Sequence, residues 1–208
     1  MNKFMRALRI QRWDDHRFYH HRRINQSLHL VSAISFVLAY GVLLVDPPTA
    51  ALIAWLVSMT SRQCGHFFFE PRGYDTVNQA THEHKEAIKV GYNLRRKVVL
   101  MALWGGAPLL VLIQPDLWGA VSPHTNSPHT DFAGALRNVG WLWLWLGVGG
   151  LVFRTVHLFW LFDVQTGLVW ACKILSDPFH DIVLYHRAPL ALLRGEWIDP
   201  MGHASAPR

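Results

Sequence analysis

Cysteine is scarce in this chain of 208 residues, with only two copies, Cys64 and Cys172. The charge map places both on the reducing side of a membrane, so we expect no structural disulfide. The chain also lacks a glycine motif in a strand–turn–helix setting, which excludes a nicotinamide or flavin site. Its glycine cluster at 147–150 lies inside an apolar run and is typical of close helix packing. No basic motif carries interleaved stacking aromatics, so nucleic acid is not an expected partner.

Lysine and arginine are absent from two stretches, residues 46–48 and 114–135. Seven basic residues instead precede the first apolar run, and six lie between the second and third runs. Basic residues stay on the cytoplasmic side of a membrane. We therefore expect a multi-pass protein of a bacterial inner membrane, with both termini and the 70–97 connection in the cytoplasm. The net charge of +6 follows from this topology.

The lengths of the apolar runs predict the fold class. We expect an all-α integral membrane bundle of about four transmembrane helices, with cytoplasmic interfacial helices. The first two spans form a hairpin that turns at Asp46-Pro47-Pro48, and Ser176-Asp177-Pro178 predicts a helix start in the tail. Without a repeat or a long linker, residues 1–208 form a single membrane domain. Its expected spans are about 26–45, 49–69, 97–113 and 138–162, with an interfacial tail over about 166–200.

Eleven of the thirteen histidines fall on the predicted cytoplasmic side. His21, Asn25 and His29 are spaced i, i+4, i+8 before the first span, and His66 and Glu70 are spaced i, i+4 after the second. If both stretches are helical, each set lies on one helix face. The antiparallel hairpin then brings His29 and His66 to the same depth. Imidazoles gathered at one depth of a membrane bundle indicate a metal site.

Two or three imidazoles and a carboxylate, with open positions, form a ligand set suited to non-haem Fe(II), although Zn or Mn would also accept it. Asn25 is expected to orient a ligand. His157 can approach from the inner end of the fourth span. His82 and His84 point apart, so at most one faces the site. The sequence leaves open which of these histidines complete the site: His82, His84, His157 and His180.

The H-x3-N-x3-H motif at residues 21–29, followed by G-H-x3-E at residues 65–70, resembles the yeast-type 2-hydroxy fatty acid dioxygenase family and its bacterial relatives. The resemblance covers the first third of the chain. It implies Fe(II)-dependent alpha-oxidation, in which a 2-hydroxy acyl chain reacts with dioxygen and leaves as an acid one carbon shorter. It also implies His21, His29 and His66 as iron ligands, with Asn25 and Glu70 as supporting catalytic residues.

The resemblance implies Fe(II) as the cofactor, with a membrane lipid or fatty acyl chain and dioxygen as partners. From the residues alone, we expect metal ligation by His82 and His157 beside the three motif histidines. Arg95 and Arg96, at the inner end of the third span, are placed to attract the carboxylate of an acyl acid. Alternatively, these arginines only mark the cytoplasmic end of the third span, as membrane topology alone requires.

Two other functions remain open from the sequence. The pattern H-x3-H-H, formed by His16, His20 and His21, is one histidine-box spacing of membrane di-iron hydroxylases and desaturases. No matching histidine box follows later in the sequence. A non-catalytic protein that binds haem through His29 and His66, or that organises lipids, belongs to a different class. Oligomeric state, including a homo-oligomer, is also open.

Overall fold

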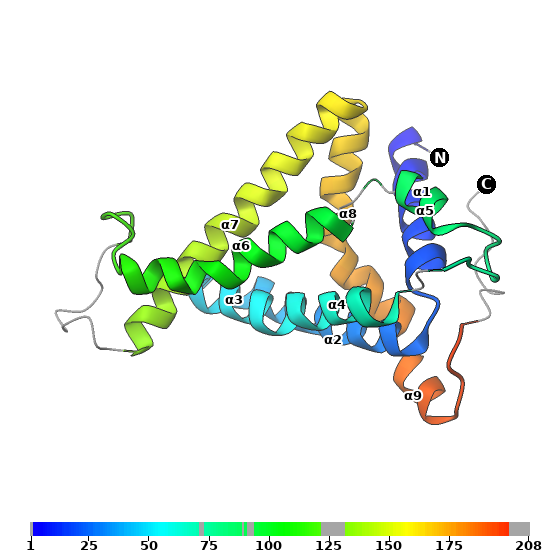
Figure 1. Ribbon diagram of the computed structural model, residues 1–208, viewed down its shortest axis with the longest axis horizontal. Coiled ribbons are helices and arrows are strands. Elements are labelled where there is room, and N and C mark those ends of the chain that lie inside the picture. The colour runs from blue at the N-terminus through cyan, green and yellow to red at the C-terminus, as the bar shows by residue number, and fades with distance from the viewer. Residues whose placement is uncertain (1, 71–72, 89, 91–93, 122–131, 200–208) are drawn as a thin grey trace.

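Helices dominate the computed structural model, which describes residues 2–70, 73–88, 90, 94–121 and 132–199 (Figure 1). Within these residues, strand-like pairing is limited to isolated bridges of Arg22 with Ile198 and of Asp75 with Ala80. The predicted all-α class is therefore confirmed. The elements are α1 (Lys3–Tyr19), α2 (Arg23–Leu43), α3 (Pro47–Ile53), η1 (Ala54–Met59), α4 (Thr60–Cys64), η2 (Gly65–Phe69), α5 (His82–Ile88), α6 (Leu94–Ile113), α7 (Phe132–Leu161), α8 (Val164–Tyr185) and α9 (Ala188–Leu193).

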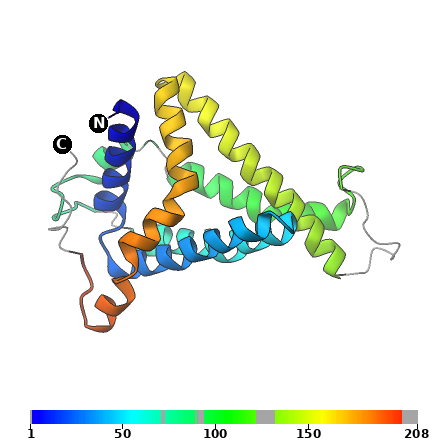
Figure 2. The ribbon, with the colours of Figure 1, turned by 180° about the vertical axis from the view of Figure 1, so that it is seen from behind.

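A helical hairpin forms the base of the molecule (Figures 1 and 2). Its first arm is α2, and its second is the run from Pro47 to Phe69, in which the π-helical segments η1 and η2 alternate with α3 and α4. Pro47 and Pro48 begin this run, where a missing N–H costs nothing. Asp46 Oδ2 accepts a 2.6 Å hydrogen bond from Thr49 at the turn. Every segment of the second arm contacts α2, so the end of the run lies beside the start of α2.

Tryptophans form the centre of the apolar core between the hairpin, α6 and α7. Trp55 Nε1 donates to the carbonyl of Trp143 at 2.9 Å, and Trp143 Nε1 donates to the carbonyl of Trp104 at 3.0 Å. The rings of Trp104 and Trp143 stack with centroids 5.8 Å apart. The N–H groups of Trp55 and Trp143 therefore each have a backbone acceptor, which offsets the cost of burying these two rings.

Helix α8 carries its charges inward and its apolar side chains outward. Lys173, Asp177 and Asp181 are buried, whereas Phe179 and Val183 are 54% and 72% exposed. In water this pattern would be reversed, because charges keep their solvation at the surface. It is favoured where the surroundings are apolar and the charges can pair inside the protein.

The helix start predicted at Ser176 is wrong, because α8 begins at Val164 and continues through Pro178. Asp163 is the N-cap, and its carboxylate accepts the backbone N–H of the first turn. The Ser176 hydroxyl donates instead to the carbonyl of Cys172, one turn earlier. A serine that bonds back to its own helix does not cap a new one.

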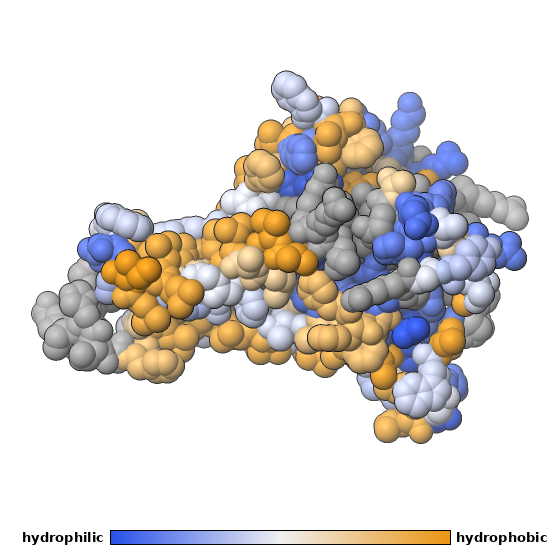
Figure 3. Space-filling model, viewed as in Figure 1, coloured by the Kyte–Doolittle hydropathy of each residue, from blue (hydrophilic) through white to orange (hydrophobic). Residues whose placement is uncertain are grey.

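Two helices are long and apolar enough to cross a membrane: α2, with 21 residues, and α7, with 30. Helix α6 contains a shorter apolar stretch, Lys97–Ile113. Apolar residues cover much of the long body of the molecule, and hydrophilic residues gather at the end that holds α1 and α5 (Figure 3). Apolar surface of this extent is typical of a protein that contacts a membrane.

Gly140 allows α7 to cross closely over α3. A Cβ added at this position would lie 2.5 Å from the carbonyl oxygen of Pro48 and 2.9 Å from its carbonyl carbon. The clash is with backbone, which cannot rotate away. We expect Gly140→Ala to lower the free energy of unfolding by about 1–3 kcal/mol, measured as a lower thermal midpoint in detergent.

Gly134→Ala is the matched control on the same helix, since its added Cβ would meet no atom within 4 Å. Alanine favours helix over glycine, by about 1 kcal/mol in an exposed helix interior, so this variant should be as stable as the wild type or more stable. Equal midpoints for the two variants would contradict the close crossing of α3 and α7.

Candidate metal centre

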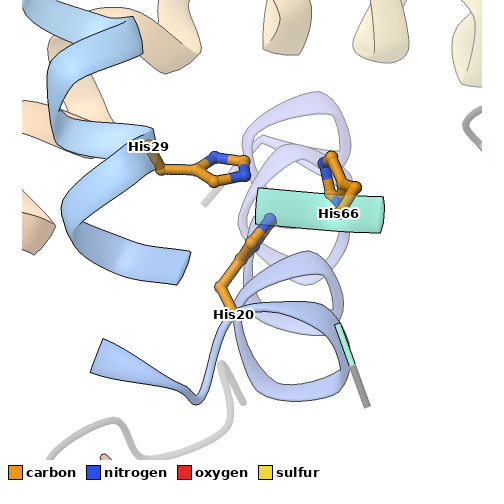
Figure 4. Close-up of side chains that lie close together, drawn as sticks. All are labelled: His20, His29 and His66. Atoms are coloured by element: carbon orange, nitrogen blue, oxygen red, sulfur yellow. The ribbon is translucent and has the colours of Figure 1, made fainter. Parts of the chain in front are cut away.

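Three histidines from three separate elements meet near the start of the hairpin. One ring nitrogen each from His20, His29 and His66 lies within 4.8 Å of the others. The ring centroids are 4.0 Å apart for His20 and His29, 4.9 Å for His29 and His66, and 5.1 Å for His20 and His66. All three residues are buried, and His29 is 0% exposed. Figure 4 shows the three rings directed toward a common centre.

A sharp corner between α1 and α2 brings His20 to this centre. Helix α1 ends at Tyr19 and α2 begins at Arg23, so the residues between them turn back on the bundle. Asn25 Nδ2 donates to the carbonyl of Tyr19 at 2.7 Å, and Gln26 Nε2 donates to the carbonyl of His20 at 2.8 Å. Both amides are fully buried. They satisfy carbonyls left without a helical partner at the end of α1.

Gly65 allows the two arms of the hairpin to approach at the level of the histidines. An added Cβ would lie 2.2 Å from Asn25 Oδ1 and 3.4 Å from His29 Cδ2. Any side chain here would push α2 away from η2. Because His66 is the next residue, this contact fixes the spacing between the His29 and His66 rings.

The buried imidazole nitrogens of the cluster fit a metal ion. Neither ring nitrogen of His29 has a hydrogen-bond partner in the described structure, nor does Nε2 of His20. A buried polar atom without a partner costs about 1–3 kcal/mol, and three such atoms at one point are uncommon. A cation held by these nitrogens would remove that cost. Imidazole nitrogen suits Fe, Zn, Cu and Ni.

Burial also keeps His20 in the form that binds a metal. Burial lowers the pKa of His20 well below its usual value, and the neighbouring His29 lowers it further. His20 is therefore neutral at physiological pH, with a lone pair available on one ring nitrogen. A metal ligand must be deprotonated before it can coordinate.

Glu70 is hydrogen-bonded to the third imidazole, that of His66. Its Oε2 lies 2.7 Å from Nδ1 of His66, and Lys97 Nζ lies 3.5 Å from the same oxygen. A carboxylate bonded to one ring nitrogen fixes the tautomer and leaves the other nitrogen for a metal. Glu70 therefore orients His66, and Lys97 balances the charge of Glu70.

Paired charges on α8 lie next to the cluster. Asp181 Oδ2 lies 3.4 Å from Arg62 Nη1 and 3.9 Å from Nδ1 of His29. The second distance is too long for a hydrogen bond, so Asp181 acts on His29 through its charge. Arg62 lies in the second arm of the hairpin, and this ion pair joins that arm to α8.

A second set of charges ties α1 to α8. Lys173 Nζ lies 2.9 Å from Asp15 Oδ2 and also bonds Asp177, which accepts from Arg12 at 3.1 Å. Burial alone would raise the pKa of Asp15, but Lys173 holds it well below its usual value. Burial alone would lower the pKa of Lys173, but Asp15 and Asp177 raise it above its usual value. Asp15 and Lys173 are therefore both ionised, and their pairing offsets the cost of burial.

The structure brings together two of the expected ligands, His29 and His66, and replaces His21 by His20. His21 Nδ1 lies 4.0 Å from Asp75 Oδ2 and 3.4 Å from the carbonyl of Arg17, away from the cluster. The expected i, i+4, i+8 spacing required one helix through residues 21–29, but the chain turns at residues 20–22. The His20-His21 doublet was the available signal for a ligand just before α2.

The other expected residues lie elsewhere. His157 Nδ1 is 3.1 Å from Arg154 Nη1, and His82 begins α5. His84 is exposed and His180 is half-buried. None of these four histidines belongs to the described cluster. The side chains of two expected substrate-binding residues lie outside the described part of the chain: Arg95 and Arg96.

No protein family, no characterised protein and no solved structure matches this chain in comparisons of sequence and fold. The chemistry of the site therefore rests on its own residues.

The role of Glu70 is testable by a conservative change. Glu70→Gln removes the charge behind His66 while keeping the size of the side chain. We expect metal affinity to fall about 10–100-fold, measured by competition between the purified protein and a chelator for Co(II) or Zn(II).

Glu83→Gln serves as the control, because Glu83 is exposed on α5 and belongs to no part of the cluster. Its metal affinity should equal that of the wild type. An unchanged affinity in Glu70→Gln would show that Glu70 does not support the ligand.

Proposed function

We propose that this protein is a non-haem, Fe(II)-dependent membrane oxygenase that acts on a lipid or fatty acyl substrate. The observation that carries the proposal is the buried cluster of His20, His29 and His66. In the described structure, Nε2 of His20 and both ring nitrogens of His29 have no hydrogen-bond partner. Three neutral nitrogen ligands leave coordination positions for substrate and dioxygen. Bound Fe(II) would supply the activation of dioxygen.

A cavity of about 450 Å³ supports an apolar substrate. His66 contributes to its wall, and most of the remaining wall is apolar side chains from the hairpin, α6, α7 and α8. Helix α1 adds the polar residues Gln11, Asp14 and Asp15. An apolar pocket with a few polar groups at one place is the usual form of a small-molecule site. A substrate that fills it presents its reacting carbon beside the histidine cluster.

The reaction we propose is the alpha-oxidation implied by the resemblance to 2-hydroxy fatty acid dioxygenases. A 2-hydroxy acid and dioxygen give an acid one carbon shorter, with carbon dioxide and water completing the balance. All electrons come from the substrate carbon, so the chain needs no reductant. Its residues hold the acid, exclude water and place the substrate next to the buried imidazoles.

The geometry disfavours haem ligation by His29 and His66. A porphyrin bound by both would have to lie between their rings, whose centroids are 4.9 Å apart. His20 is packed against both, with centroid distances of 4.0 and 5.1 Å. A third imidazole in that position is better suited to a mononuclear metal ion.

We further propose a topology of four spans. Helices α2 and α7 have the length to cross alone. The continuous run Pro47–Phe69 has 23 residues, about 34 Å of helix if its rise is that of an α-helix, and α6 has 20. In this arrangement the histidine cluster lies at the cytoplasmic face of a bacterial inner membrane, beside α1 and α5.

Metal binding tests the proposal first. We expect a loss of Fe(II) affinity of more than about 100-fold in each of three variants: His20→Ala, His29→Ala and His66→Ala. Each of them removes a metal ligand, whereas Glu70→Gln changes only a residue that orients a ligand. The measurement is iron content after anaerobic purification, with a chelator titration of each variant. In the wild type, oxygen consumption should depend on both bound iron and added long-chain 2-hydroxy acid.

His21→Ala is the matched control, one residue away from His20 and buried outside the cluster. It should retain iron. If His21→Ala loses iron while His20→Ala keeps it, the corner between α1 and α2 is placed wrongly. If the protein binds iron but shows no substrate-dependent oxygen uptake, the metal site is supported and the proposed reaction is rejected.

A further inference from the structure

The cavity beside His66 is long and has two different ends. Its wall includes His66 and Trp55, which are eleven residues apart on the same helical run. At the α-helical rise of 1.5 Å per residue, the two lie roughly 16 Å apart along the axis. The cavity therefore extends from the histidine cluster to the tryptophan core.

The end near His66 is polar. Arg62, Gln63 and Lys97 contribute to the wall there, and Arg62 and Lys97 are already paired with carboxylates. Gln63 is 8% exposed, and its Oε1 has no hydrogen-bond partner in the described structure. A buried acceptor without a partner favours a ligand that brings a hydroxyl or acid O–H to this point.

A rigid apolar floor lies toward the opposite end of the cavity. Trp55 and Trp143 both contribute to the wall, and the hydrogen bond from Trp55 Nε1 to the Trp143 carbonyl holds the two together. Trp104 stacks on both, with centroids 6.3 Å from Trp55 and 5.8 Å from Trp143. Rings fixed in this way cannot rotate aside to admit a longer ligand.

We infer that this cavity holds the single alkyl chain of an acyl acid and that the Trp55–Trp143 floor limits the length of that chain. The inference rests on the proposed function, which supplies the acyl substrate. The polar group of the acid lies at Gln63 and His66, and its methyl end meets the tryptophans. A mostly apolar cavity of about 450 Å³ with polar groups beside His66 suits one alkyl chain better than a two-chain lipid.

Glycines of α7 form the side wall that the chain passes. Gly147 and Gly150 both line the cavity, together with Trp143 one turn earlier. A Cβ at Gly150 would meet no atom within 4 Å, so a side chain can be added at this position of the cavity wall. Gly149 is adjacent and exposed, is not part of the cavity wall, and also has no atom within 4 Å of an added Cβ.

Two substitutions of the same chemistry therefore separate cavity filling from a general effect on α7. Gly150→Leu narrows the cavity, and Gly149→Leu adds the same side chain to the outer surface. Saturated tritiated fatty acids of stepwise increasing length are bound to the whole protein in lipid nanodiscs, and empty nanodiscs give the background. No metal turnover is needed for this measurement.

In the wild type we expect affinity to rise about fourfold per added methylene group and to stop rising at the length that reaches the floor. Gly150→Leu should move this limit to shorter chains and lower the affinity for the longest bound chain at least about tenfold, or 1.4 kcal/mol. Gly150→Ala should give a smaller shift. Gly149→Leu should match the wild type.

The inference is overturned if Gly150→Leu, with a thermal midpoint equal to that of Gly149→Leu, binds every chain length as the wild type does. Affinity that rises without limit in the wild type would also overturn it. The outcome is separable from the proposed function: a length limit without iron-dependent oxygen uptake supports a lipid-binding cavity, and oxygen uptake without a length limit leaves the oxygenase intact.

Discussion

The close contact between α2 and η2 at Gly65 is the constraint on which the rest of the structure depends. It leaves no room for a Cβ beside Asn25 and sets the distance between the His29 and His66 rings. Asn25 uses its amide nitrogen to hold the end of α1 at the same time. One buried side chain therefore positions both the hairpin and the corner that supplies His20. This explains why the three imidazoles converge although none of them bonds another.

This arrangement buries several charged side chains, and ion pairing offsets the cost of their desolvation. Asp15 and Asp177 pair with Lys173 and Arg12 between α1 and α8, and Arg62 pairs with Asp181 beside His29. Removing a single member would leave an uncompensated charge in an apolar interior, which is strongly destabilising. The inward charges of α8 also explain its outward apolar face. The same helix can therefore place paired charges beside the histidine cluster and an apolar face on the outer surface.

The sequence predicted the parts of the site that depend on local pattern. The Asp46-Pro47-Pro48 turn and the lengths of two apolar runs are local signals, and they place His29 opposite His66. His20 depends on distant residues instead. The corner at residues 20–22 is held by the C-terminal segment: Arg23 N donates to the Trp197 carbonyl, and Asp199 N donates to the His21 carbonyl. Periodicity within residues 21–29 carries no information about contacts with residues 197–199.

The difference between local pattern and distant contacts also explains why the sequence predicted neither the start of α8 nor the cavity. Ser176-Asp177-Pro178 has the composition of a helix start, yet Asp177 is committed to Lys173 and Arg12, so it is not available as a cap. A tertiary ion pair overrides a local preference. The cavity depends on the angle at which α7 crosses the hairpin, and that crossing is fixed by Gly140 against Pro48. A glycine in an apolar run indicates close packing from sequence alone, but only the crossing shows that Gly147 and Gly150 border a space leading toward His66.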